Sequence, residues 1–162
     1  MMREKIEDNL KVVNFILIAL LIVFIAHLLS GGKTSSTPVE TVAAKVTAAA
    51  DLTNVTQADS QKLKKYYGLN ANDYEGVAFY LGNSNMDVDE ILIVRMKDSA
   101  QENALKDAMQ TRIDTQTQSF EGYGVNQTKL LKDAVIDVKG NYALLVVNEK
   151  AAEADEAFRK SL

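Results

Sequence analysis

The stretch VIDVKGNYALLVVN, residues 135–148, decides the fold of this chain. Its two halves are rich in valine, leucine and isoleucine, which favour strands, and Gly140-Asn141 separates them. A two-residue connection of this composition is typical of a tight hairpin turn, because both residues tolerate a positive φ. The sequence therefore predicts two antiparallel strands, Val135–Lys139 and Tyr142–Asn148.

A second hairpin is predicted earlier in the chain. Gly76–Leu81 alternates in the manner of a strand, and Ile91–Met96 is almost continuously apolar, as expected for a central strand. Between them, Gly82–Asn85 has the composition of a turn. Because strands joined by hairpins pair antiparallel, we expect one four-stranded antiparallel sheet made of two β-hairpins.

Helical patterns surround these strands. Apolar residues recur every three or four positions in four segments, which we expect to be helices: residues 38–49, 59–67, 99–120 and 149–162. Helices packed on an antiparallel sheet define an α+β domain. The two innermost strands are apolar on both faces, so either helices cover both faces of the sheet or one face awaits a partner.

The N-terminus carries a different signal. Val12–Leu29 has only Asn14 and His27 as polar residues, and as a helix it would span ~27 Å, close to the thickness of a bilayer core. More basic residues precede this segment than follow it, which predicts a cytoplasmic N-terminus. The alternative is a cleaved signal peptide, since the strictly apolar core, residues 15–26, has the length of a signal h-region.

These patterns divide the chain into four parts. We expect a cytoplasmic tail over residues 1–11, a transmembrane anchor or signal sequence over 12–29, a linker over 30–37 and an exported α+β domain over 38–162. The expected location is the cell membrane, with a single pass and the C-terminal domain extracellular. The partner of residues 12–29 is then the membrane itself.

The composition excludes several kinds of chemistry. The chain has no cysteine, and its one histidine, His27, lies in the apolar N-terminal segment. The domain therefore lacks a thiolate or imidazole for nucleophilic catalysis or metal binding, so we assign no catalytic residue and expect no cofactor. The formal net charge of −4 argues against nucleic acid as a partner, because phosphate binding needs a basic surface.

One acidic segment is a candidate calcium site. In NSNMDVDE, residues 83–90, oxygen-bearing side chains alternate as they do in a calcium loop, with Asp87, Asp89 and Glu90 as the carboxylates. The loop lacks the glycine at its sixth position and the glutamate at its twelfth, and strands flank it. We therefore expect a solvated hairpin loop without metal.

The main candidate site is a cluster in the second half of the domain. Arg112, Gln116 and Phe120 are spaced four residues apart and so share one helix face, and Tyr123 follows the helix end. We expect Gln116 to satisfy backbone groups of the loop 121–127 while Phe120 and Tyr123 pack that loop down. The alternative is a ligand pocket made of the same side chains. The cluster, structural or ligand-binding, consists of Arg112, Gln116, Phe120, Tyr123, Gln127 and Tyr142.

The same residues resemble a known family. The pattern R-x3-Q-x3-F-x2-Y that begins at Arg112, then Gln127 and Leu130, then the hairpin residues 138–142, is similar to the bacterial domain-of-unknown-function family 4358. Residues 89–91, where two acids lead into a strand, are similar as well, so that the resemblance covers most of the domain.

This resemblance implies a small exported domain attached to the cell envelope of a Gram-positive bacterium, with no assigned activity. Many members of the family carry a lipobox cysteine, which this chain lacks, and the apolar segment 12–29 would take its place.

Two functions and a purely structural role remain after these exclusions. The first is a non-catalytic binding or interaction module of the cell envelope, with a protein or a cell-wall component as its partner. The second is an enzyme that uses carboxylates or a lysine on a cell-wall component, which would need a concave pocket with at least two convergent acids of perturbed pKa.

Overall fold

The computed structural model describes residues 13–23, 34–50, 52 and 55–162. The chain divides into two compact units, Met1–Lys33 and Thr34–Leu162. In the first unit, residues 13–23 form a helix, and all of its side chains are exposed.

The first unit bears on the predicted membrane anchor. Over the described ranges, no helix has both the length and the apolar character needed to cross a membrane. The predicted cytoplasmic tail, both ends of the predicted apolar span and half of the predicted linker lie outside the described residues. The anchor therefore stays a prediction.

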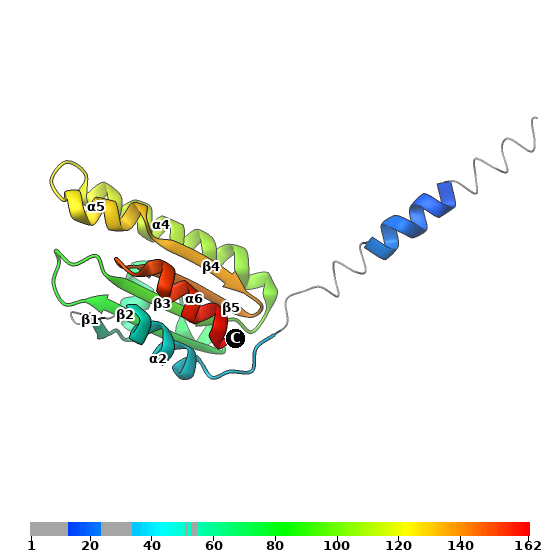
Figure 1. Ribbon diagram of the computed structural model, residues 1–162, viewed down its shortest axis with the longest axis horizontal. Coiled ribbons are helices and arrows are strands. Elements are labelled where there is room, and N and C mark those ends of the chain that lie inside the picture. The colour runs from blue at the N-terminus through cyan, green and yellow to red at the C-terminus, as the bar shows by residue number, and fades with distance from the viewer. Residues whose placement is uncertain (1–12, 24–33, 51, 53–54) are drawn as a thin grey trace, which may run out of the picture. The chain divides into compact units, whose positions relative to one another are not determined.

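The second unit is an α+β domain built on one antiparallel sheet, as predicted (Figure 1). Its strands lie in the order β1-β2-β3-β5-β4. The strands are β1 (Val55–Gln57), β2 (Gly76–Gly82), β3 (Glu90–Arg95), β4 (Val135–Lys139) and β5 (Tyr142–Val147). The helices are α2 (Val39–Ala50), α3 (Ser60–Tyr67), α4 (Glu102–Phe120), α5 (Val125–Lys132) and α6 (Ala151–Ser161). Two short 3₁₀ helices cover Ala71–Asp73 and Ser99–Gln101.

The prediction of four strands was wrong, because the described part of the sheet has five. The additional strand, β1, pairs antiparallel with β2, so that Val55 lies opposite Gly82 and Gln57 opposite Tyr80. Three residues are too few to show an alternating pattern, and their pairing partner lies more than twenty residues further along the chain. The strand also occupies the edge of β2, which would otherwise present unpaired backbone groups.

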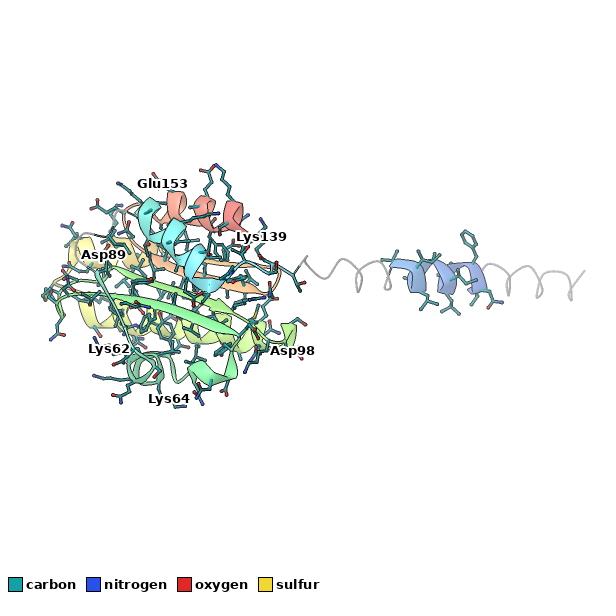
Figure 2. All side chains as sticks on the ribbon, turned by 90° about the horizontal axis from the view of Figure 1, so that it is seen from below. Lys62, Lys64, Asp89, Asp98, Lys139 and Glu153 are labelled. Atoms are coloured by element: carbon teal, nitrogen blue, oxygen red, sulfur yellow. The ribbon has the colours of Figure 1, made fainter. Side chains whose placement is uncertain are left out.

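Helices cover both faces of the sheet, so the first of the two predicted alternatives is correct. Successive side chains of β3 point to opposite faces, with Leu92 and Val94 in one cluster and Ile91 and Ile93 in the other. The first cluster is covered by α3, α4 and α5, and the second by α2 and α6. Figure 2 shows α2 (cyan) and α6 (red) side by side on their face of the sheet.

Local signals place α3 and α4 over the sheet. Asp59 caps the start of α3 by accepting a hydrogen bond from the backbone of Lys62, and Gly68 ends α3 in the left-handed conformation at φ 71°. The turn before α4 is closed by a capping box between Asp98 and Gln101. These ends leave Tyr67 as the last residue of α3, facing the sheet.

The predicted linker over residues 30–37 is docked to the domain in its described part. The backbone N–H of Ser35 donates to Asn141 Oδ1 at 2.8 Å, and Asn141 Nδ2 donates to the carbonyl of Ser35 at 3.2 Å. The hydroxyl of Tyr142 donates to the carbonyl of Thr37, whose own hydroxyl donates to the carbonyl of Ser161 at 3.2 Å. The structural domain therefore begins at Thr34, four residues before the predicted boundary.

This docking predicts that a fragment of residues 34–162 is more stable than one of residues 39–162. The shorter fragment loses four hydrogen bonds and leaves the hydroxyl of the buried Tyr142 without its acceptor, a loss of about 2–4 kcal/mol. Urea unfolding of both fragments measures the difference. Asn141→Ala should cost the longer fragment more than the shorter one, and equal costs would contradict the docking.

Two aspartates, Asp137 of β4 and Asp155 of α6, both bind Arg159 on the face of the sheet that α2 and α6 cover. Arg159 Nη2 lies 2.9 Å from Asp137 Oδ1, and Arg159 Nε lies 3.1 Å from Asp155 Oδ2. The other oxygens, Asp137 Oδ2 and Asp155 Oδ1, are buried without a hydrogen-bond partner in the described structure. Burial, followed by the neighbouring carboxyl group of Asp137, raises the pKa of Asp155.

The raised pKa predicts how stability responds to Asp155→Asn. The folded state holds the proton on Asp155 more tightly than the unfolded state, so stability falls as the pH rises from the ordinary aspartate pKa through the raised one. Asparagine offers Asp137 a neutral donor at every pH. The variant should therefore melt at a higher temperature than the wild type at neutral pH, and this gain should shrink towards pH ~4.

Thermal unfolding of both proteins between about pH 4 and pH 8 measures this gain. The matched control is Asp133→Asn, which removes a carboxylate from an exposed pair with Lys129 and should change stability little. A gain for Asp155→Asn that does not depend on pH would contradict the assignment.

Candidate functional site

The candidate site is built on the buried carboxylate of Glu90, the first residue of β3. Glu90 shares its face of the strand with Leu92 and Val94, and α3 and α4 cover that face. Only 1% of Glu90 is exposed. A carboxylate removed from water to this degree is costly unless a positive charge and several donors surround it.

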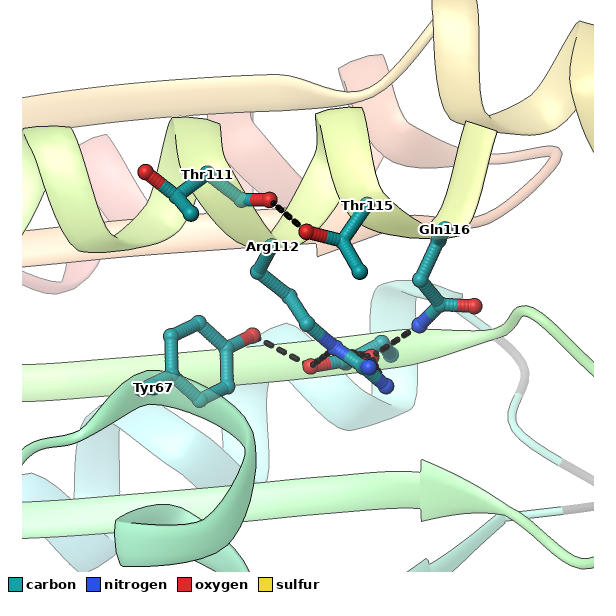
Figure 3. A network of polar contacts seen from close by, with 6 residues as sticks. Tyr67, Thr111, Arg112, Thr115 and Gln116 are labelled. Carbon is teal, nitrogen blue, oxygen red and sulfur yellow. Dashed lines mark hydrogen bonds and ion pairs between the residues drawn. The ribbon is translucent and has the colours of Figure 1, made fainter. Parts of the chain in front are cut away.

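Three side chains from two helices satisfy Glu90 (Figure 3). Arg112 of α4 donates from Nη2 to Glu90 Oε2 at 2.8 Å, and its Nε lies 3.2 and 3.1 Å from the two carboxylate oxygens. One turn later on α4, Gln116 Nε2 donates to Glu90 Oε2 at 2.9 Å. The hydroxyl of Tyr67, at the end of α3, donates to Oε1. The carboxylate is therefore fully engaged from one side of the sheet.

Two tyrosines hold this network in place. Burial, followed by the charge of Glu90, raises the pKa of Tyr67 well above its ordinary value, so its hydroxyl keeps the proton that it donates. The neighbouring Tyr66 stacks on Arg112, with the guanidinium carbon 4.4 Å from the ring centroid. Tyr67 also packs edge-on against Phe79 of β2, with ring centroids 5.5 Å apart.

The sequence predicted part of this arrangement. Arg112 and Gln116 do share one face of α4, but the partner expected for Gln116 was wrong, since its amide binds Glu90 and not the loop backbone. Glu90 itself was considered as a calcium ligand and as part of the family resemblance, but not as the partner of Arg112. A usable signal was present, because a charged residue that opens an apolar strand needs a countercharge from whatever covers that strand.

A groove of about 490 Å³ lies above the network, between α3, the loop joining β2 to β3, and α4. Its volume falls in the range of about 300–1,000 Å³ that is usual for small-ligand sites. Glu90, Arg112 and Gln116 line the groove. Lys62 and Tyr66 of α3 form one wall.

The groove contains polar groups that the protein does not use. Gln116 must turn its Nε2 towards the carboxylate, which leaves its Oε1 without a donor among the described residues. The side-chain amides of Asn83 and Asn85, in the β2–β3 loop, likewise have no partner in the described ranges. The site therefore presents free amide groups beside a buried, rigid ion pair.

The predicted cluster is only partly brought together. Arg112, Gln116, Phe120 and Tyr123 all line the groove. Phe120 is buried as expected, but Tyr123 is 65% exposed, so the expectation that it packs the loop down was wrong. The two rings are in contact, with centroids 5.7 Å apart and planes tilted by 42°.

The other two members of the cluster have different roles. Gln127 of α5 donates from Nε2 to the carbonyl of Met86 at 3.2 Å, which ties α5 to the β2–β3 loop. Tyr142 does not belong to the cluster, since it is buried in the core under α2 and α6, on the other side of the sheet. Tyr142 is the first residue of β5, and its side chain points to the same face of the sheet as those of Leu144 and Val146. Glu90 and its partners lie on the opposite face.

The three carboxylates of the calcium candidate do not converge. Asp87 accepts from the backbone of Ser84 at 3.0 Å, Asp89 accepts from Asn148 Nδ2 at 2.6 Å, and Glu90 binds Arg112. Within the described part of the chain, no group of three or more acids or histidines is placed to hold a metal ion. Each carboxylate is committed to a protein donor, which accounts for the divergence.

One protein family matches the part of the chain that contains this site. A family described as a domain of unknown function, DUF4358, matches residues 48–148, more than half of the chain. The chain belongs to the DUF4358 family. The matched part of DUF4358 contains β1 to β5, α3 to α5 and every residue of the Glu90 network. No curated protein and no solved structure matches the chain.

The buried ion pair yields a stability prediction. Arg112→Met leaves Glu90 buried without its countercharge and should destabilise the domain by about 3–5 kcal/mol. Adding Glu90→Gln to this variant removes the stranded charge, so the double variant should recover part of the loss. Urea unfolding of fragment 34–162 measures all three proteins.

The matched control is Lys106→Met, which breaks the exposed pair between Lys106 and Glu102 on the same helix. An exposed pair of this kind contributes about 0–1 kcal/mol, so the control should change stability little. Equal losses in the control and in Arg112→Met would show that Glu90 is not stabilised by its partner.

Proposed function

We propose that this chain is a membrane-anchored binding module of the cell envelope in a Gram-positive bacterium, and that its ligand occupies the groove between α3, the β2–β3 loop and α4. The observation that carries the proposal is that free amide groups line the groove beside the rigid ion pair of Glu90 and Arg112. Gln116 offers an unused acceptor while its other end is held by Glu90. A ligand that binds there meets groups that are already oriented, which reduces the entropic cost of binding.

The charges in the groove support binding over catalysis. The groove is lined by two carboxylates, and one of them, Glu90, is held by Arg112 and by two neutral donors. Asp155 has a raised pKa and lies near a second acid, Asp137. Asp137 points to the face of the sheet under α2 and α6, which is opposite to the face that carries the groove. The enzyme alternative needs two acids converging in one concave site.

The position of the groove supports a role for an anchored domain. The groove lies at the end of the sheet where β3 begins, whereas Ser35 docks at the opposite end, beside the turn between β4 and β5. Figure 2 shows Asp89 and Lys139 at these two ends. A domain anchored through residues 12–29 would therefore hold its groove at the end away from the attachment point.

In-cell photo-crosslinking tests this proposal. The full-length chain carries p-benzoylphenylalanine in place of Tyr123, at the mouth of the groove, or in place of Glu153 as a matched exposed control on α6. Glu153 lies on the other face of the domain from the groove wall residue Lys62 (Figure 2). Light-dependent adducts should form from position 123, and Thr115→Trp, which fills the groove, should reduce them.

Equal adduct yields from positions 123 and 153 would contradict a ligand in the groove. Mass spectrometry of the same purified protein reads its N-terminus. Recovery of peptides from residues 1–29 supports the anchor, whereas a chain that starts after residue 29 would refute the anchored half of the proposal.

A further inference from the structure

We infer that the ligand of the groove is an uncharged glycan, with one sugar ring stacked on Tyr123 and its hydroxyls bound by the amides of the β2–β3 loop and α4. This inference rests on the proposed function, because it names the chemical class that the same groove would bind.

The charge of the groove favours a neutral ligand. Its cationic side chains are Lys62 and Arg112, and its anionic side chains are Asp87 and Glu90. The charge of Arg112 is neutralised by Glu90 at 2.8 Å. The remaining charged side chains of the lining are one cation, Lys62, and one anion, Asp87, so their formal charges sum to zero. A phosphate polymer needs a surplus of positive groups, and a cationic ligand needs a surplus of negative groups. The described lining offers neither.

Tyr123 offers the groove a stacking surface. Its ring contacts that of the buried Phe120, with the centroids 5.7 Å apart and the planes tilted by 42°, while 65% of Tyr123 stays exposed. The face of an aromatic ring is electron-rich and attracts weakly positive C–H groups, which a sugar ring presents on its apolar side. The exposed ring of Tyr123 is therefore accessible to a flat, partly apolar ligand.

The amides of the groove suit hydroxyl groups. Asn83 and Asn85 each carry a donor and an acceptor, and Gln116 Oε1 adds an acceptor whose direction is set by Glu90. A hydroxyl is both a donor and an acceptor, so a row of hydroxyls pairs with a row of amides without leaving a buried group unsatisfied. The hydroxyls of Thr115 and Ser119 are less available, because each donates to a carbonyl of α4.

The pairing of β2 excludes one mode of peptide binding in the groove. An extended peptide can bind by adding a strand to a free sheet edge. At the groove, β2 is paired on one side with β1 and on the other with β3, so neither edge of its last residues is free. The apolar side chains that line the groove, Leu81 and Phe120, do not form the deep apolar pocket that anchors a helical peptide.

Titration of the purified full-length chain in detergent tests the glycan. The probes are chitotetraose, cellotetraose and mannotetraose, with polyglycerol phosphate as the charged control. The chain has no tryptophan, so tyrosine fluorescence and calorimetry report binding. At least one neutral glycan should bind more tightly than polyglycerol phosphate. Tyr123→Ala should weaken that binding about tenfold, and Tyr123→Trp should restore it.

Val125→Ala is the matched control, because Val125 is 80% exposed close to Tyr123 in the chain but does not line the groove. It should leave binding unchanged. Failure of every neutral glycan to bind would overturn this inference, as would binding that Tyr123→Ala does not affect.

The crosslinking experiment separates this failure from a failure of the proposed function. Adducts from position 123 that are removed by glycan hydrolases support the glycan. Adducts that only proteases remove leave the binding module standing and refute the glycan. No adducts above the control at position 153 would refute both.

Discussion

Glu90 places a negative charge inside the domain at the point where the central strand begins, and the structure around it follows from the need to satisfy that charge. A carboxylate with 1% exposure is tolerated only with a countercharge and further donors. Its partners come from the end of α3 and the middle of α4, so meeting the requirement sets the distance between these helices. The groove between the helices is therefore a consequence of the same ion pair that holds them to the sheet.

The two faces of the sheet serve different purposes. The face under α2 and α6 carries an apolar core, the acid pair of Asp137 and Asp155, and the docking point of the N-terminal residues. The face under α3, α4 and α5 carries the Glu90 network and the groove. Because side chains alternate along each strand, neighbouring residues of β3 and β5 belong to different faces, and both faces can be specialised without conflict.

Local patterns in the sequence were sufficient for the two hairpins and for the shared helix face of Arg112, Gln116 and Phe120. These features depend on residues that are close in the chain, such as Gly140, which adopts φ 61° in its turn. The features that sequence reasoning missed depend on distant pairs. Arg112 and Glu90 are separated by 22 positions, and β1 is too short to be recognised without its partner strand. Tyr142 was assigned to the site by its place in a motif, and its side-chain direction in β5 excludes it.

The docking of Ser35 on Asn141 also determines how the domain would respond to mechanical tension. A pull on the chain at residue 34 is met first by the hydrogen bonds to Asn141 and by those of Thr37 with Tyr142 and Ser161. These bonds lie at the opposite end of β3 and β5 from Glu90, and behind them comes α2, which packs on the other face of the sheet from the groove. Stretching would therefore peel away the first residues and then α2 before it reached β1 and α3, so the groove would keep its walls until α2 had detached.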